Sequence, residues 1–179
     1  VIEKASRMTA TLTDGRELKV LGVLSDNEQR DLAVLQIEGS GYPWLPLGDS
    51  RSVRVGDEIA VIGSPLGLST TLSTGVVAAV RNEGLPQDEK GPKLGAWTMQ
   101  ITAATSPGSS GSPVLSRQGY VVAIVVGIVT SGEGMNFGIR AEEAKALLDR
   151  IPAGAAPTPF AATPSTSSEV LRNLAISAA

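Results

Sequence analysis

The 179-residue chain is 42% hydrophobic, carries a net charge of −3, and contains neither cysteine nor histidine. It is long enough to bury one substantial core or two small ones. The missing residue types exclude disulfides and remove the usual transition-metal ligands, so we expect no metal and no cofactor. Without a basic cluster, nucleic-acid binding has no electrostatic support.

Short β-rich runs separated by turn residues make up most of the chain. The first two runs, residues 7–13 and 16–24, flank Asp14-Gly15, which is a strong hairpin signal. A second hairpin signal lies at Gln118-Gly119. Further runs rich in Val, Ile, Leu and Thr predict strands at residues 31–38, 57–63, 71–81, 96–103, 113–116, 120–129 and 135–139.

Near the end of the chain, the apolar residues are spaced as on one face of a helix. The helical stripe consists of Ala144, Leu147, Leu148 and Ile151, and Pro152 follows it. Glu142 and Glu143 stand at the start of this helix, where negative charge favours the dipole, and we assign them no chemistry. Many short strands with one closing helix indicate an all-β fold of antiparallel barrels or a sandwich.

The domain boundaries follow from turn-prone and low-complexity stretches. Residues 44–56 are the expected join, which divides the chain into an N-terminal part, 1–47, and a second part with the helix, 48–151. Residues 152–168 hold four prolines and no charge, which is the composition of a linker. Residues 169–179 are expected to begin a further segment or domain.

Ser110 lies in a loop whose composition suits nucleophilic chemistry. Gly108 and Gly111 allow positive φ, and Pro107 and Pro113 stiffen the two ends. Because Pro107 has no N–H, an anion cradle here must come from residues 108–110. A pair of such N–H groups can stabilise the tetrahedral oxyanion of acyl transfer. The chain offers this serine no imidazole base, and a turn without chemistry is the alternative interpretation.

Five motifs in order resemble the HtrA/Deg group of trypsin-like serine endopeptidases over roughly residues 1–150. They are DLAVLQI (31–37), VIGSPLGL (61–68), STGVV (73–77), QITAATSPGSSGSPV (100–114) and NFGI (136–139). The resemblance implies an all-β fold of two chymotrypsin-like antiparallel β-barrels, the first incomplete here, with a C-terminal helix. The catalytic triad would lie between the barrels.

The resemblance also implies roles for single residues. Asp31 would be the aspartate of the triad and Ser110 the nucleophile. The N–H groups of Gly108 and Ser110 would form the oxyanion hole, with that of Ser109 nearby. The family's histidine would come directly before Val1, so we expect the sequence to begin one residue after the general base. The early strands of the first barrel would be missing with it.

Substrate preference follows from the same resemblance. The residue six positions before the nucleophile lies at the base of the primary pocket, and here it is the uncharged Ala104. Thr105, Ile124, Val125 and Val126 would form the pocket walls, which favours small to medium aliphatic side chains. The implied partners are unfolded or misfolded polypeptides and further copies of the chain in a trimer. The implied location is extracytoplasmic, in a bacterial periplasm or cell envelope.

Three positions depart from the family pattern: Ser109 replaces an Asn, Ser112 a Gly, and Arg140 a Pro. Two other function classes stay open at this stage. One is a non-catalytic trypsin-like domain that binds extended peptides in the same cleft. The other is a structural β-barrel module in which the Gly/Ser loop is only a turn.

Overall fold

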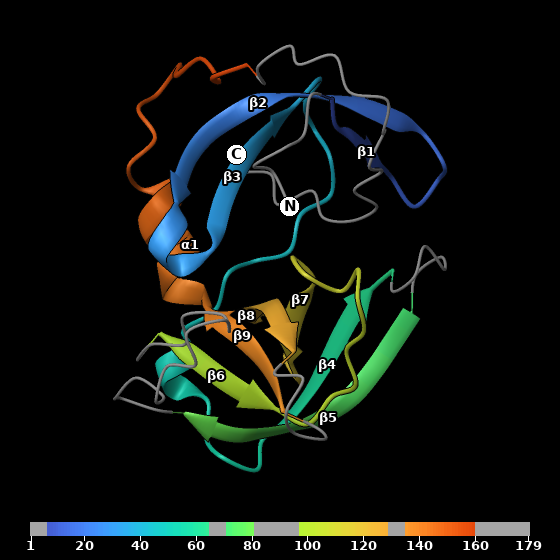
Figure 1. Ribbon diagram of the computed structural model, residues 1–179, viewed down its shortest axis with the longest axis vertical. Coiled ribbons are helices and arrows are strands. Elements are labelled where there is room, and N and C mark those ends of the chain that lie inside the picture. Colours follow the sequence, from blue (N-terminus) through green and yellow to red (C-terminus); the bar gives the residue numbers. More distant parts are fainter. Residues whose placement is uncertain (1–6, 65–70, 81–96, 129–134, 160–179) are drawn as a thin grey trace.

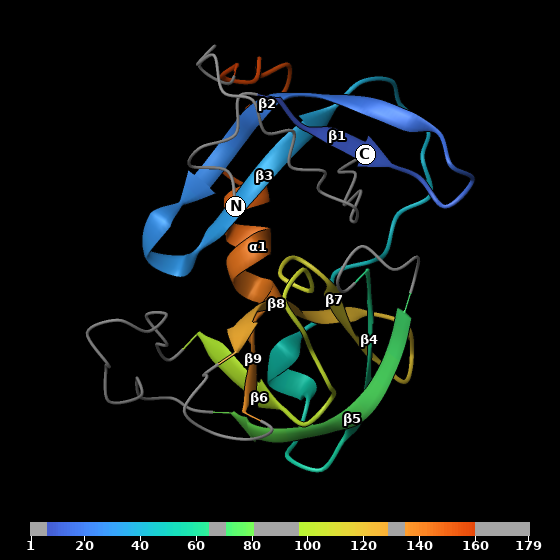
Figure 2. The same ribbon diagram turned by 45° about the vertical axis from the view of Figure 1, so that its right-hand side comes forward.

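The computed structural model describes residues 7–64, 71–80, 97–128 and 135–159. They form an open sheet of three strands and a closed barrel of six, with helix α1 between them on one side (Figures 1 and 2). This arrangement confirms the predicted all-β class with one incomplete β-structure and a C-terminal helix. In these residues, no helix is long and apolar enough to cross a membrane.

The N-terminal sheet pairs its strands antiparallel in chain order. It consists of β1 (Thr9–Thr11), β2 (Glu17–Asn27) and β3 (Leu32–Ile37). The predicted Asp14-Gly15 turn joins β1 to β2, and Gly15 adopts a φ of 86°, which glycine reaches without strain. Among described residues up to 47, the buried hydrophobic side chains are those of Met8, Leu18 and Val20. The core of this sheet is therefore thin.

The barrel closes in the order β4-β5-β6-β9-β8-β7. Its strands are β4 (Glu58–Gly63), β5 (Thr71–Val80), β6 (Thr98–Ile101), β7 (Pro113–Ser116), β8 (Val121–Ile128) and β9 (Asn136–Arg140). Each strand falls on a run predicted from the sequence. Inside, Val77, Met99, Ile101 and Val114 are fully buried. Because the strands close on themselves, the barrel leaves no open sheet edge.

Helix α1 (Ala141–Leu148) follows β9 directly and buries Ala141, Ala144 and Leu147. It ends one turn earlier than the apolar stripe suggests. The Ile151 N–H donates to the Leu148 carbonyl at 3.0 Å, which is a tighter turn than that of an α-helix. The early end has a local cause, since proline at 152 disfavours the helical backbone for the residue before it.

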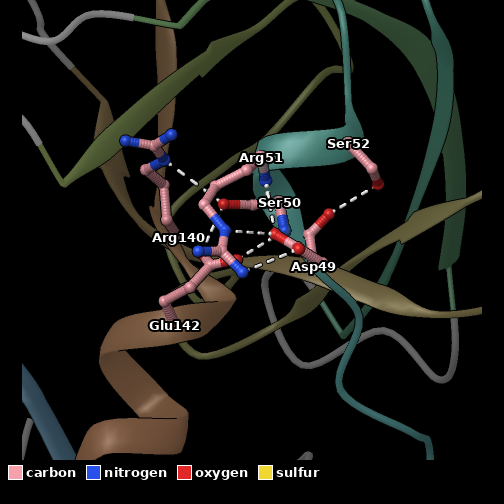
Figure 3. Close-up of polar contacts among 6 residues, drawn as sticks. All are labelled: Asp49, Ser50, Arg51, Ser52, Arg140 and Glu142. Carbon is pink, nitrogen blue, oxygen red and sulfur yellow. Dashed lines mark hydrogen bonds and ion pairs between the residues drawn. The ribbon is translucent and has the colours of Figure 1, made fainter.

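A buried serine connects the start of α1 to the segment that joins sheet and barrel (Figure 3). Ser50, in the short 3-10 helix η2 (Ser50–Ser52), is 0% exposed. Its N–H donates to the Glu142 carboxylate at 2.7 Å, its hydroxyl donates to the same carboxylate, and Arg140 Nε donates to its Oγ at 3.2 Å. Nearby, hydrogen bonds from Arg51 hold the pKa of the Asp49 carboxyl far below its usual range. The joining segment is thus fixed to the helix.

The first residues of the segment expected to be a linker, 152–168, lie against β2. Val23 and Thr158 exchange both backbone hydrogen bonds, at 3.0 and 2.8 Å. At this point β2 carries Gly22, where a Cβ would overlap the Thr158 carbonyl oxygen. Residues 152–159 therefore return to the N-terminal sheet and are not a free spacer. The rest of that segment, and residues 169–179, fall outside the described residues.

Candidate active site

Ser110 lies in the connection between β6 and β7. Figures 1 and 2 show that this connection reaches the side of the barrel that faces the N-terminal sheet. We call residues 105–112 the Ser110 loop. It contains two successive tight turns, closed by the Ser109 N–H to the Ser106 carbonyl at 2.9 Å and the Ser112 N–H to the Ser109 carbonyl at 3.0 Å. Gly108 and Gly111 take the third position of each turn with φ of 95° and 89°. That position of a type II turn requires positive φ.

The base of the Ser110 loop is tied to β8. The Gly111 N–H donates to the Val125 carbonyl at 2.7 Å, and the Val125 N–H donates to the Ser112 carbonyl at 2.9 Å. Ser109 is buried, and its Oγ accepts the Ser106 N–H at 3.2 Å. Ser110 itself is exposed, and its hydroxyl makes no hydrogen bond within the described residues. The loop is thus tied to the barrel by hydrogen bonds and presents one exposed serine.

The turns determine which of the three N–H groups of the predicted anion cradle already have an acceptor. The N–H of Ser109 is engaged by the Ser106 carbonyl. Those of Gly108 and Ser110 have no acceptor in the described part of the chain. Two N–H groups, one on either side of Ser109, therefore remain able to bind a developing negative charge.

Three hydrogen bonds fix Ala103, the predicted pocket base Ala104, and the first residue of the loop, Thr105. The Ser73 hydroxyl donates to the Ala104 carbonyl at 2.7 Å. Thr105 Oγ1 donates to Asn136 Oδ1, and Asn136 Nδ2 donates to the Ala103 carbonyl, both at 2.8 Å. No role was predicted for Asn136. Asn136 is the first residue of the NFGI motif, but nothing in that motif indicates its hydrogen bonds to Thr105 and Ala103.

The three β8 residues predicted to line the pocket differ in what their side chains contact. Val125 belongs to the barrel core, whereas Ile124 packs in a second cluster with Leu115, Val121 and Ala144. Val126 is half-buried. Since Ile124 and Val125 are 8% and 2% exposed, their side chains serve packing first, and a wall role for all three stays a prediction.

Asp31 lies on the N-terminal sheet, directly after the short 3-10 helix η1 (Glu28–Arg30) that connects β2 to β3. It is exposed, and its N–H donates to the Glu28 carbonyl at 3.3 Å. Its backbone is left-handed, with φ 51° and ψ 43°. The candidate nucleophile and the candidate orienting carboxylate thus come from the two different β-structures.

The chemistry available to this pair is limited by what the chain contains. With no histidine in the 179 residues, the imidazole that a serine and an aspartate would share is not among them. Within the described ranges, no three His, Cys, Asp or Glu side chains gather to hold a metal ion. The arrangement can present a nucleophile and stabilise an oxyanion, and it needs a base.

Comparisons with known proteins identify the family of the chain. Residues 1–124 match the family described as "Trypsin-like peptidase domain". The chain is 36% identical over 157 residues to a putative serine protease, HhoA, of Synechocystis sp., covering 86% of this chain and 39% of that protein. It is also 36% identical over 154 residues to a probable periplasmic serine endoprotease, DegP-like, of Halomonas elongata, covering 84% of this chain and 31% of that protein.

Two solved structures that resemble the chain are proteases of the HtrA type. The HtrA-type protease AlgW with a decapeptide superposes with a TM-score of 0.63 at 29% sequence identity, covering 78% of this chain and 43% of that one. A variant of that protease with a decapeptide gives a TM-score of 0.68 at 28% identity, covering 79% and 42%. The chain spans 31% to 39% of the length of the two curated relatives.

Proposed function

Because the chain belongs to the trypsin-like peptidase family, we propose that it forms the peptidase domain of a serine endopeptidase. The observation that carries the proposal is the Ser110 loop. Its two turns leave Ser110 exposed. Of the N–H groups of Gly108, Ser109 and Ser110, the turns engage only that of Ser109. The N–H groups of Gly108 and Ser110, on either side of Ser109, remain available to the carbonyl oxygen of a bound peptide.

In the proposed reaction, Ser110 Oγ attacks the carbonyl carbon of a peptide bond while an imidazole takes its proton. The carbonyl oxygen becomes an oxyanion that accepts hydrogen bonds from the N–H groups of Gly108 and Ser110. Collapse of this intermediate releases the amine, which the imidazole protonates, and water then hydrolyses the acyl-serine. Asp31 orients the imidazole. The family resemblance assigns that imidazole to a histidine directly before Val1.

We further propose polypeptide substrates with a small or medium aliphatic side chain before the scissile bond. Ala104 brings no charge to the pocket base, and Thr105 has its hydroxyl engaged by Asn136. Unfolded or misfolded proteins as substrates, and assembly as a trimer, follow from the family alone. The relatives named as periplasmic endoproteases support an extracytoplasmic location, for which we propose the periplasm or cell envelope of a bacterium.

A second candidate is a non-catalytic trypsin-like domain that binds extended peptides, and both HtrA-type structures compared above hold a peptide. The two candidates differ in one respect that can be tested. The endopeptidase needs only an imidazole to become active, whereas the binding domain stays inactive when one is supplied.

A fluorophosphonate probe decides between them. We expect the 179-residue chain to remain unlabelled and without turnover, since loss of one triad member removes about 10⁶ of the rate. The protein expressed with the segment that the family places before Val1 should be labelled at Ser110. It should also cleave after Val or Ala and not after Lys or Arg. Ser110→Ala and a histidine-to-alanine variant are the controls. If the extended protein folds but stays unlabelled, the endopeptidase proposal is wrong and the peptide-binding domain takes its place.

A further inference from the structure

The connection between β2 and β3 holds an unusual backbone conformation. Asp31 is the one non-glycine residue with positive φ among the described residues. Aspartate adopts this conformation more readily than most L-residues, but at some cost in energy, which favourable contacts around it must offset. The preceding residue, Arg30, contacts groups from three parts of the chain.

Arg30 is held by three groups from three places in the chain. Its N–H donates to Asn27 Oδ1 at 3.2 Å, which closes η1. Its Nε donates to the Glu143 carboxylate in the first turn of α1. Its guanidinium lies over the ring of Trp97, 4.4 Å from the centroid, directly before β6. One side chain therefore connects the N-terminal sheet with both the helix and the barrel.

The Arg30–Glu143 ion pair differs from the others among the described residues. Its side chains are 29% and 24% exposed, against 63% and 51% in the Arg16–Asp14 pair of the first hairpin. Partial burial reduces screening by solvent and salt, and the planar guanidinium can pair with a carboxylate and stack on a ring at once. These contacts can hold η1 in place, which a fully exposed pair does poorly.

We propose that Arg30 is a positioning residue for Asp31. With its side chain fixed by Glu143 and Trp97, it holds the end of η1 and so keeps Asp31 in its left-handed conformation, with the carboxylate directed for catalysis. This inference rests on the proposed function, in which Asp31 orients the imidazole. Small displacements of an orienting group lower the turnover of such enzymes strongly.

The test uses Arg30→Met, Arg30→Lys and Glu143→Gln, with Arg16→Met as the matched control. Arg16 is also paired with a carboxylate, but far from α1. In the 179-residue chain, NMR of the Asp31 Cα shift and amide–Hα coupling reports its backbone conformation directly. In the extended protein that contains the histidine, steady-state kinetics report catalysis.

We expect Arg30→Met to shift the Asp31 signals and to lower kcat by up to about 10²-fold while KM is unchanged. Arg30→Lys should recover part of the loss, Glu143→Gln should show a smaller one, and Arg16→Met none. A folded Arg30→Met protein with wild-type Asp31 signals and wild-type kcat overturns the inference and leaves the proposed function intact. If the extended wild-type protein is not labelled by the fluorophosphonate, the proposed function fails, and the positioning role falls with it.

Discussion

Two buried serines show how the surroundings of a residue decide what its hydroxyl contributes. Ser50 and Ser112 are 0% and 1% exposed. The Ser50 hydroxyl contacts both Glu142 and Arg140, whereas the Ser112 hydroxyl has no partner among the described residues. It fills the space beside Gly63, where a Cβ would fall on it. The departure from the family's glycine at 112 thus buries a polar atom without compensation.

We therefore expect opposite results from the same substitution at the two positions. Ser50→Ala should lower the free energy of unfolding by about 1–3 kcal/mol, because the half-buried charged groups of Glu142 and Arg140 lose a partner. Ser112→Ala should be neutral or stabilising by up to about 1 kcal/mol, because only an unsatisfied hydroxyl is removed. Urea denaturation of the two variants measures both effects. A loss at Ser112 equal to that at Ser50 would show that its hydroxyl has a partner after all.

At the scale of elements, the Val23–Thr158 pairing makes the segment after α1 part of the N-terminal sheet. It adds two backbone hydrogen bonds to β2 beyond those from β1 and β3. The close approach depends on glycine at 22, since any side chain there would meet the Thr158 carbonyl. The stability of the sheet should therefore depend on a segment more than 100 residues away in sequence.

The dependence can be isolated by a double-mutant cycle. Gly22→Ala should lower the free energy of unfolding by about 1–3 kcal/mol, through the overlap it creates. In a chain that ends at residue 156 the overlapping atoms are gone, so the same substitution should cost less; the part of the cost that comes from the φ of 156° at Gly22 remains. Equal costs in the two chains would mean that the pairing contributes nothing to stability.

Short sequence patterns predicted the strands and turns well. Contacts between residues far apart in the sequence could not be predicted from such patterns. The strands, the hairpin at Asp14-Gly15 and the glycine turns of the Ser110 loop each follow from a few adjacent residues. The contact between Arg30 and Glu143 joins residues 113 positions apart, and nothing in either neighbourhood indicates it. The same holds for Thr158, whose Pro/Ala-rich surroundings predicted a linker. The engaged N–H of Ser109 also depends on a turn geometry that composition alone leaves open.

In the described part of the molecule, a closed barrel is combined with an open sheet of three strands. The barrel is closed and contains most of the buried hydrophobic side chains, whereas the N-terminal sheet is open and buries three up to residue 47. Three polar attachments connect the sheet and the joining segment to the rest of the described chain: Arg30 with Glu143 and Trp97, Ser50 with Glu142, and Val23 with Thr158. In addition, Leu32 of β3 packs on the apolar cluster of Leu115, Val121, Ile124 and Ala144. Two of the polar attachments end on the first turn of α1, so the helix is the main connection.

Hydrogen exchange should therefore divide the molecule at this connection. In the 179-residue chain, we expect the amides of β6, β8 and β9 to exchange only on global unfolding, because they lie in a closed sheet around the main core. Amides of β1 and β3 should exchange through a local opening at lower free energy, since these are edge strands over a thin core. Glu142→Ala should accelerate exchange in the N-terminal sheet more than in the barrel strands, because it releases Ser50 and with it the joining segment. Equal protection in both halves, or equal acceleration by the variant, would show that sheet and barrel unfold as one cooperative unit.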